Sequence, residues 1–117
     1  MKRILFIIFL IPLIVNASER DYQERFCASI GGQAEFVLPD RTRVDCLTEH
    51  HAIEVDFARK WAEAIGQSLH YAKMTGKAPG VLLIVDGERD QKYIDRLYGA
   101  INRWHLPIQV WTVEKTE

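Results

Sequence analysis

The sequence predicts a single α/β domain in which a mixed central sheet is flanked by helices. Strand-like segments alternate with amphipathic helical segments in the second half of the chain, which is typical of this fold class. The run over residues 81–85 is continuously apolar, as in a strand that is buried on both faces. A turn signal at residues 39–42 separates two strand-like segments and indicates an antiparallel hairpin.

A first helix is predicted to begin after Ser18. The serine side chain can accept hydrogen bonds from first-turn amides, and the acidic residues that follow lie near the positive end of the helix dipole. The expected buried face is an apolar stripe with a spacing of four residues: Tyr22, Phe26 and Ile30. Glycines at positions 31 and 32 end this helix.

Three strands are predicted next, over residues 33–38, 43–47 and 52–57. Because side chains alternate along a strand, the first is expected to place three residues on one face: Ala34, Phe36 and Leu38.

The rest of the chain alternates helix and strand. A helix over 58–74 is expected to end at Gly76, which suits a left-handed cap. The apolar strand over 81–85 follows, then a helix over 89–104 and a last strand over 108–113. The last helix is expected to bury one stripe: Tyr93, Ile94, Leu97 and Ile101.

The N-terminus has the pattern of a secretory signal peptide over residues 1–17. Lys2 and Arg3 form a basic region, an apolar run follows from 4 to 15, and Ala17 is a small residue at the expected cleavage position. About a dozen apolar residues are too few to span a ~30 Å hydrocarbon core as a helix, although an uncleaved N-terminal anchor remains the alternative. Cleavage leaves one domain over 18–117, exported to the periplasm or secreted.

Charge excludes a protein that covers duplex nucleic acid with its whole surface, because such proteins are normally basic. The chain has 15 Lys and Arg against 16 Asp and Glu. Without Lys2 and Arg3 the mature part has 13 against 16, a net charge of −3. A compact site with local cations and a metal ion is compatible with this charge.

The two cysteines, Cys27 and Cys46, both lie in the exported part and are expected to form an intramolecular disulfide. The bond would close a loop of roughly 20 residues and contribute about 3 kcal/mol in the chain-entropy model. Two free buried thiols are the alternative.

Acidic side chains lie on two neighbouring predicted strands, and a helix follows at once. Asp45 lies on the second strand, and Glu54 and Asp56 lie on the third. Carboxylates on neighbouring strands, with a cation close by, suit a site that holds Mg²⁺ and hydrolyses a phosphodiester. Polar side chains at helical spacing follow on one predicted face: Lys60, Glu63, Gln67 and Tyr71.

The order of elements and these residues together resemble the PD-(D/E)xK nuclease superfamily, which has the restriction-endonuclease-like fold. The family core is an αβββαβ unit with a metal-binding acid on one strand and a Glu-x-Lys on the next. By this resemblance Asp45 corresponds to the motif aspartate, and Glu54, nine residues later, corresponds to the motif glutamate. Gln67 and Tyr71 look like the Gln-x-x-x-Tyr of the branch related to RecB-type and CRISPR-associated exonucleases. The resemblance covers residues 33–85 well and the rest more loosely.

The chain departs from the family where Asp56 replaces the family's lysine, which positions the attacking water and stabilises charge on phosphorus. Some relatives relocate this cation to the following helix, and Lys60 is the candidate here, with Asp56 as a third acid at the metal. Two other interpretations stay open. The fold has lost its chemistry and keeps the polar cluster for binding, or the resemblance is coincidental.

Each candidate residue also has a purely structural interpretation. Asp45 beside Arg43 fits a surface cross-strand pair, and Glu54 with Asp56 fits the solvated face of a half-buried strand. The polar helix residues fit a solvated face on which an ion pair contributes only tenths of a kcal/mol. Glu24 in the first helix is a further candidate acid, because part of the family uses an acid from that helix.

These features predict an exported nuclease-like domain that uses Mg²⁺ or Mn²⁺ to hydrolyse phosphodiester bonds of DNA or RNA. The predicted catalytic residues are Asp45, Glu54, Lys60, Gln67 and Tyr71, and the predicted metal ligands are Asp45, Glu54 and Asp56. The alternative is a catalytically degenerate periplasmic binding or interaction module on the same fold. A small structural envelope protein is a third class, and it would scatter the polar residues over the surface.

The expected partner is nucleic acid, and no membrane contact is expected once the signal peptide is cleaved. About 100 residues offer little surface to grip a duplex, so a homodimer also stays open. The four histidines have no metal-ligand spacing and none is assigned to a metal.

Export makes the first testable prediction. N-terminal sequencing of the protein recovered from the periplasm or medium is expected to begin at Ser18, because the cleavage signal ends at Ala17. Recovery of intact Met1 in a membrane fraction would instead establish the anchored form.

Overall fold

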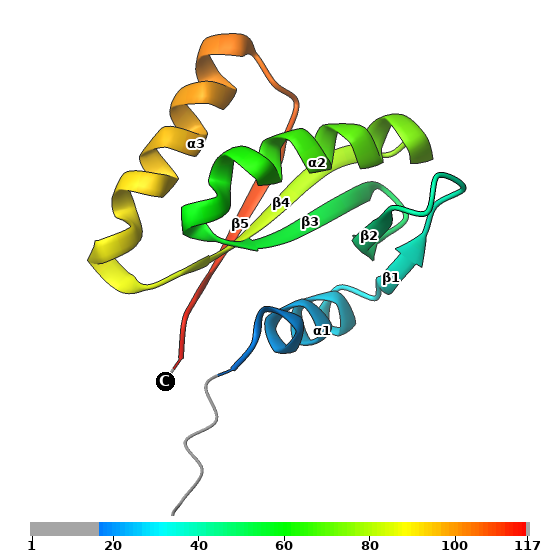
Figure 1. Cartoon of the computed structure of the whole chain (residues 1–117), viewed down its shortest axis with the longest axis horizontal. Helices are drawn as coiled ribbons and strands as arrows, with labels where there is room; N and C mark the ends of the chain where they lie inside the picture. Colours follow the sequence, from blue (N-terminus) through cyan, green and yellow to red (C-terminus); the bar gives the residue numbers. More distant parts are fainter. Residues whose placement is uncertain (1–16, 117) are drawn as a thin grey trace, which may run out of the picture.

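The computed structural model describes residues 17–116 and arranges them as a five-stranded mixed sheet between helices (Figure 1). The predicted signal peptide over 1–17 lies outside the described residues except for Ala17. Within 17–116, no helix is both long enough and apolar enough to cross a membrane. The α/β class and the flanked mixed sheet predicted from the sequence are confirmed.

The elements follow each other in the order α-β-β-β-α-β-α-β. They are α1 (Glu19–Ser29), β1 (Gln33–Val37), β2 (Arg43–Leu47), β3 (His51–Phe57), α2 (Trp61–Thr75), β4 (Ala78–Val85), α3 (Gln91–Trp104) and β5 (Gln109–Glu114). The strands lie in the sheet in chain order. β1, β2 and β3 pair antiparallel, whereas β3, β4 and β5 pair parallel.

Two helical layers cover the two faces of the sheet. α1 lies on one side, and α2 and α3 lie on the other (Figure 1). On the α2 and α3 side the core contains alternate residues of β4: Val81, Leu83 and Val85. On the α1 side the core contains the intervening residues Leu82 and Ile84, together with Ile53 and Val55 of β3. β4, which contains the apolar run predicted to be buried on both faces, is therefore buried on both faces.

α1 begins with the capping box expected at its N-terminus. The Ser18 hydroxyl accepts a hydrogen bond from the Asp21 N–H at 3.3 Å, and the Asp21 carboxylate accepts one from the Ser18 N–H at 2.8 Å. The buried stripe predicted for this helix is only partly correct. Tyr22 is buried and Phe26 packs against the core, but Ile30 follows the last helical residue and is 40% exposed.

The face predicted for β1 is wrong, because the strand switches faces at Glu35. Ala34 packs on the α1 side, whereas Phe36 and Leu38 pack with Tyr71 of α2. Glu35 has a φ of +56°, a left-handed conformation that interrupts the regular pairing of β1 with β2 between Ala34 and Phe36. A local backbone irregularity of this kind leaves no mark in an alternating sequence pattern.

α2 begins three residues later than predicted. A single 3₁₀ turn, Ala58–Lys60, leads from β3 into the helix, and Gly76 ends it in the predicted left-handed conformation with a φ of +70°. The buried residues of α2 are Ala64, Ser68 and Tyr71, with Trp61, Ile65 and Leu69 partly buried beside them. In α3 the predicted stripe of Tyr93, Ile94, Leu97 and Ile101 does pack against the core.

A disulfide between Cys27 and Cys46 ties α1 to β2, as predicted. Their Cα atoms lie 5.6 Å apart, within the range of native disulfides. Gly32 packs directly against this bond. A Cβ at position 32 would lie 2.7 Å from the Cys27 Sγ and would also overlap the Cys46 Sγ.

This packing predicts coupling between the disulfide and Gly32. Replacing both cysteines with alanine is expected to lower the free energy of unfolding by about 3 kcal/mol. Gly32→Ala alone should destabilise the oxidised protein by roughly 1–3 kcal/mol through overpacking. In the Cys27→Ala/Cys46→Ala background that cost should largely disappear, because both sulfur atoms are gone. Urea unfolding of the four proteins measures the cycle, and an equal cost of Gly32→Ala in both backgrounds would contradict it.

Candidate functional site

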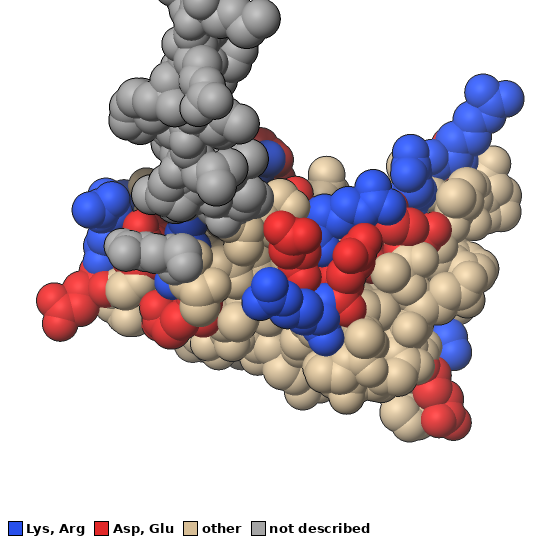
Figure 2. Space-filling view, turned by 90° about the horizontal axis from the view of Figure 1, so that it is seen from below, with Lys and Arg blue, Asp and Glu red and all other residues tan. Residues whose placement is uncertain are grey.

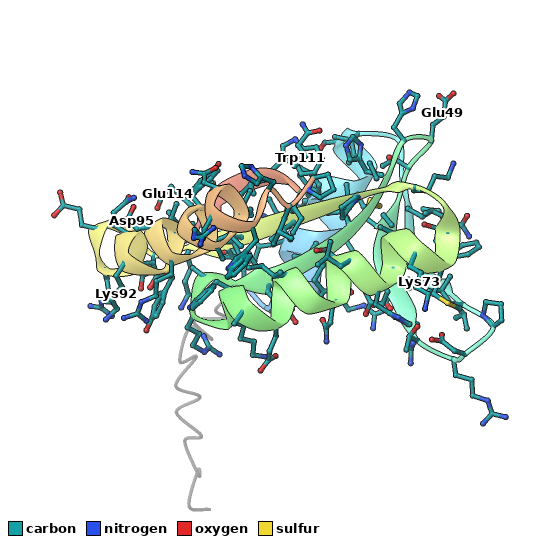
Figure 3. The ribbon with its side chains drawn as sticks, turned by 90° about the horizontal axis from the view of Figure 1, so that it is seen from above. Glu49, Lys73, Lys92, Asp95, Trp111 and Glu114 are labelled. Atoms are coloured by element: carbon teal, nitrogen blue, oxygen red, sulfur yellow. A yellow bond between two sulfur atoms is a disulfide. The ribbon has the colours of Figure 1, made fainter. Side chains whose placement is uncertain are left out.

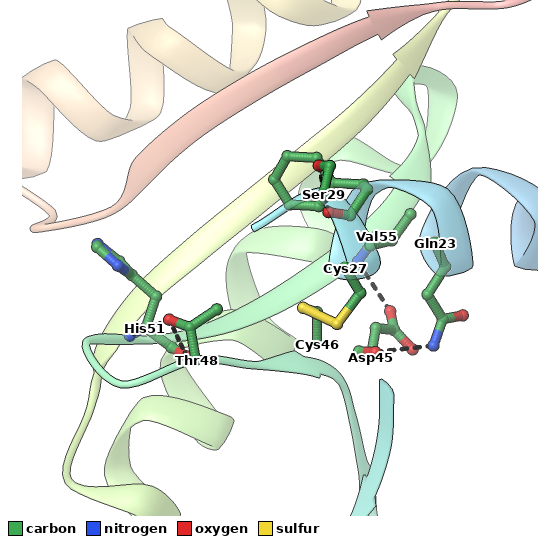
Figure 4. Close-up of a disulfide and its surroundings, with 9 residues drawn as sticks. Gln23, Cys27, Ser29, Asp45, Cys46, Thr48, His51 and Val55 are labelled. Atoms are coloured by element: carbon green, nitrogen blue, oxygen red, sulfur yellow. Dashed lines mark hydrogen bonds between the residues drawn. A yellow bond between two sulfur atoms is a disulfide. The ribbon is translucent and has the colours of Figure 1, made fainter. Parts of the chain in front are cut away.

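The candidate site lies where β2 separates from β3. The two strands pair at Cys46 with Ile53 and at Leu47 with Ala52. At the next residue of β2, the side chain of Asp45 replaces the backbone as the hydrogen-bond acceptor for β3. Its Oδ2 accepts a hydrogen bond from the Val55 N–H at 2.8 Å, while Gln23 Nε2 of α1 donates to the Asp45 carbonyl oxygen at 2.8 Å (Figure 4). The carboxylate is therefore fixed at the edge of β3.

Glu54 and Asp56 lie beside this edge and share one face of β3. Each is only 5% exposed. Their neighbours Ile53 and Val55 point to the opposite face, into the core below α1. Two carboxyl groups buried on one strand are unusual, because an isolated charge costs several kcal/mol to bury. This burial contradicts the interpretation of Glu54 and Asp56 as a solvated strand face.

α1 contributes a fourth carboxyl group, Glu19, that the sequence interpretation missed. The Glu19 carboxyl group lies close enough to Asp56 to raise the pKa of that residue. The acid considered from the sequence, Glu24, is instead exposed and pairs with Arg20, with 3.1 Å between Arg20 Nε and Glu24 Oε1. Glu19, Gln23 and Cys27 are spaced at i, i+4 and i+8, so they share the helix face that contacts β2 and β3. That spacing, combined with the disulfide, is the sequence signal that identifies Glu19.

Three carboxylate oxygens of this cluster are buried without a hydrogen-bond partner. They are Glu19 Oε1, Glu54 Oε2 and Asp56 Oδ2. Buried polar atoms are normally paired, and a group of unpaired acceptors needs protons or a cation. From here on, Glu19, Asp45, Glu54 and Asp56 are called the acid cluster.

The acid cluster raises the pKa of its own members. Burial raises the pKa of Asp45 to about 6, against the opposing effect of the Val55 N–H. Burial, followed by contact with Glu19, raises the pKa of Asp56 to about 7. The pKa of Glu54 rises most strongly, first through burial and then through the charges of Asp45 and Asp56. Each of these carboxyl groups therefore binds a proton more tightly than it would in water.

Tyr71 of α2 adjoins the acid cluster. Its side chain is buried, and the pKa of its hydroxyl is raised first by burial and then by the charges of Glu54, Asp45 and Asp56. The helix residues predicted alongside it do not share this environment. Gln67 and Glu63 are exposed, although both lie on the face predicted for Tyr71.

Lys60 is not paired with the acids. It is half-buried and occupies the N-cap position of α2. Among residues 17–116, the ion pairs within 4.0 Å join other residues, so no cationic nitrogen neutralises Asp45, Glu54 or Asp56. Arg43, considered as a partner of Asp45, instead lies 3.6 Å from Glu35, measured from Nη1 to Oε2.

The acid cluster fits a hard divalent cation by its chemistry. Carboxylate oxygens are the ligands that Mg²⁺ and Mn²⁺ prefer, and the unpaired buried oxygens supply free acceptors. In the described part of the chain, no three His, Cys, Asp or Glu side chains are already arranged to hold a metal ion. The carboxyl groups would have to move to bring the free oxygens to a common point.

Among the residues that the structure describes, the side of the molecule shown in Figure 2 carries no extended surface of one charge. Acidic and basic side chains are interspersed on the side of the molecule shown in Figure 2, and neither sign forms a continuous surface there. His70 also has a structural partner, because its Nε2 lies 2.8 Å from Asp40 Oδ2. Hydrogen bonds from Thr42, followed by this contact, lower the pKa of Asp40 to about 2.

Comparisons with protein-family models, curated proteins and solved structures found no match for this chain. The interpretation of the acid cluster therefore rests on its own chemistry and geometry.

The raised pKa values predict how stability depends on pH. In the unfolded chain the aspartates titrate near 3.8, whereas the folded Asp45 and Asp56 hold their protons to about 6 and 7. The folded state therefore binds more protons between pH 4 and 7, so the free energy of unfolding should fall as pH rises through this window. Thermal unfolding from pH 5 to 8, with chelator present, measures this loss of stability. Millimolar Mg²⁺ should restore stability at pH 8.

Asp56→Asn should flatten this pH dependence, because it removes one of the titrating carboxyl groups. Glu49→Gln is the matched control, since the Glu49 side chain is 87% exposed and should leave the slope unchanged. A melting temperature that rises from pH 5 to 8 in chelator would contradict the assignment. The lowered pKa of Asp40 affects stability only below about pH 4, so it does not change the slope between pH 5 and 8.

Proposed function

We propose that this protein is a metal-dependent nuclease that hydrolyses phosphodiester bonds of DNA or RNA. The observation that carries the proposal is the acid cluster, in which Asp45 and the buried Glu54 and Asp56 meet with unpaired oxygens at the separation of β2 and β3. A structural salt-bridge network would contain cations, whereas this cluster contains none and must take up protons or an external cation.

The order of elements supports the resemblance to PD-(D/E)xK nucleases. α1 to β4 run as αβββαβ, the order of the family core, and Asp45 and Glu54 lie on the second and third strands of this unit. These are the elements on which the family places its metal-binding aspartate and glutamate.

The residues of the cluster have separable roles in this proposal. Asp45, Glu54 and Asp56 would hold the cation through their oxygens, and Glu19 would support Asp56. When bound, the ion would lower the pKa of a water molecule and offset negative charge on the phosphate. Tyr71 would orient the acids from α2, and Gln67, exposed on the same helix, would contact the nucleic-acid backbone.

Lys60 would supply the positive charge that Asp56 does not. It lies in the turn that leads out of β3, four residues after Asp56, and is the first lysine after the acids. Its long side chain can move toward the phosphate once the negative charge of a substrate is present.

A binding module that has lost its chemistry is the second candidate. The observation that favours it is the absence, among residues 17–116, of a cation within ion-pair distance of the three acids. Such a module would bind the metal and the nucleic acid but would not cleave the nucleic acid.

Cleavage of labelled single- and double-stranded DNA and RNA tests the proposal. With Mg²⁺ or Mn²⁺ the protein should cut at least one substrate, and chelator should abolish the activity. Asp45→Ala should lose both cleavage and metal binding. Lys60→Ala should lower turnover at least 100-fold while metal and nucleic acid still bind, because it removes charge stabilisation only.

Lys73→Ala is the matched control for Lys60→Ala, because Lys73 is an exposed lysine near the other end of α2. Full activity in both Asp45→Ala and Lys60→Ala would refute the site assignment. Metal and strand binding without cleavage by the unmodified protein would establish the binding module instead.

A further inference from the structure

A cavity of about 340 Å³ lies at the carboxyl ends of the parallel strands and is separate from the acid cluster. Phe57 lines it at the end of β3, Arg59 just after β3 and Lys115 just after β5. Arg89 lines it from the turn before α3, and Lys92 from the first turn of α3. Its volume falls in the range of small-ligand sites. The carboxyl ends of parallel strands are also where α/β proteins commonly bind ligands.

The cavity is locally basic in a chain that is acidic overall. Four basic side chains and two acidic ones, Asp86 and Asp90, line it, so its net charge is +2. Both acids have partners. Asp86 Oδ2 lies 3.7 Å from Arg89 Nη1, and Asp90 Oδ2 accepts a hydrogen bond from the Asp86 N–H at 2.8 Å.

Aromatic rings, rather than carboxylates, hold the other cations of the cavity. The Arg59 guanidinium lies 5.0 Å from the centre of the Phe57 ring, and the Lys115 ammonium lies 5.8 Å from it. The Lys92 ammonium lies 5.1 Å from the Tyr93 ring. A ring positions a cation without neutralising its charge, so these groups stay free to bind an anion.

The cavity and the acid cluster meet at the end of β3. Phe57 directly follows Asp56, so their Cα atoms lie ~3.8 Å apart. Their side chains point to opposite faces, because the Phe57 ring packs on the α1 side of the sheet. A nucleic-acid strand would have to run around the end of β3, from one face of the sheet to the other, to contact both sites.

We propose that this cavity binds phosphate groups of the nucleic-acid strand next to the bond placed at the acid cluster. The proposal rests on the proposed function and adds to it a contact with the neighbouring phosphates of the substrate. Arg59 and Lys115 would make the principal contacts, and the +2 charge would offset two phosphates. This local site lets a chain with a mature net charge of −3 engage a polyanion.

Binding of a fluorescent 12-nucleotide single strand, with Ca²⁺ in place of Mg²⁺, tests the cavity without relying on cleavage. Arg59→Ala/Lys115→Ala should weaken binding at least tenfold. It should also reduce the slope of log affinity against log salt by about 1.4, since each phosphate contact on a single strand contributes about 0.7. Circular dichroism and thermal unfolding should show an unchanged fold, because both side chains are exposed.

Lys73→Ala/Arg103→Ala is the matched control, as it also removes one lysine and one arginine. Lys73 and Arg103 lie in the last turns of α2 and α3, whereas the cavity lies beside the first turns. Figure 3 shows Lys73 and Lys92 at opposite ends of the molecule. This control should keep the affinity and the salt slope of the unmodified protein.

The outcomes separate the cavity from the acid cluster. Loss of strand binding in Arg59→Ala/Lys115→Ala alone supports the cavity, even if the unmodified protein never cleaves. Equal affinity and equal salt slope in both double variants would overturn it, even if Asp45→Ala abolishes cleavage. Binding to phosphatidylglycerol vesicles without binding to the strand would assign the cavity to a lipid surface, and this too would overturn the proposal.

Discussion

The bond between Asp45 Oδ2 and the Val55 N–H is the interaction on which the candidate site depends. It satisfies a backbone donor at the point where β2 leaves β3, so the sheet can open without an orphaned amide. Gln23 of α1 donates to the Asp45 carbonyl oxygen, so α1 is attached to β2 at the point where β2 leaves β3. The opening exposes one edge of β3 to Glu19, which completes the cluster around Glu54 and Asp56.

Burying acids without cations lowers the stability of the folded protein as these acids lose their protons. Proteins commonly neutralise buried carboxyl groups with arginine or lysine, whereas this cluster does so with protons that its raised pKa values retain toward neutral pH. The proposed divalent cation would replace those protons, which would link folding thermodynamically to ion binding. The disulfide ties α1 to β2 against the mutual repulsion of the acids.

Most of the fold could be predicted from local signals, because periodicity, caps and glycines act within a few residues. The capping residues of α1 and Gly76 of α2 are examples, as is the pairing of the cysteines. The face switch at Glu35 and the choice of Glu19 over Glu24 could not be predicted in this way. The two glutamates differ by five residues and so point roughly 140° apart around the helix axis. Only the contacts of α1 with β2 decide which one faces the acids.

The disulfide also makes the site dependent on the compartment in which the chain folds. Cys27, Gln23 and Glu19 share one helix face, so the covalent bond that fixes the first also presents the other two to β2 and β3. In a reducing cytosol this restraint would be missing, and α1 would be free to detach from the acids of β3. Under the proposed function, oxidation of the two cysteines would complete the site, so the reduced chain would lack nuclease activity.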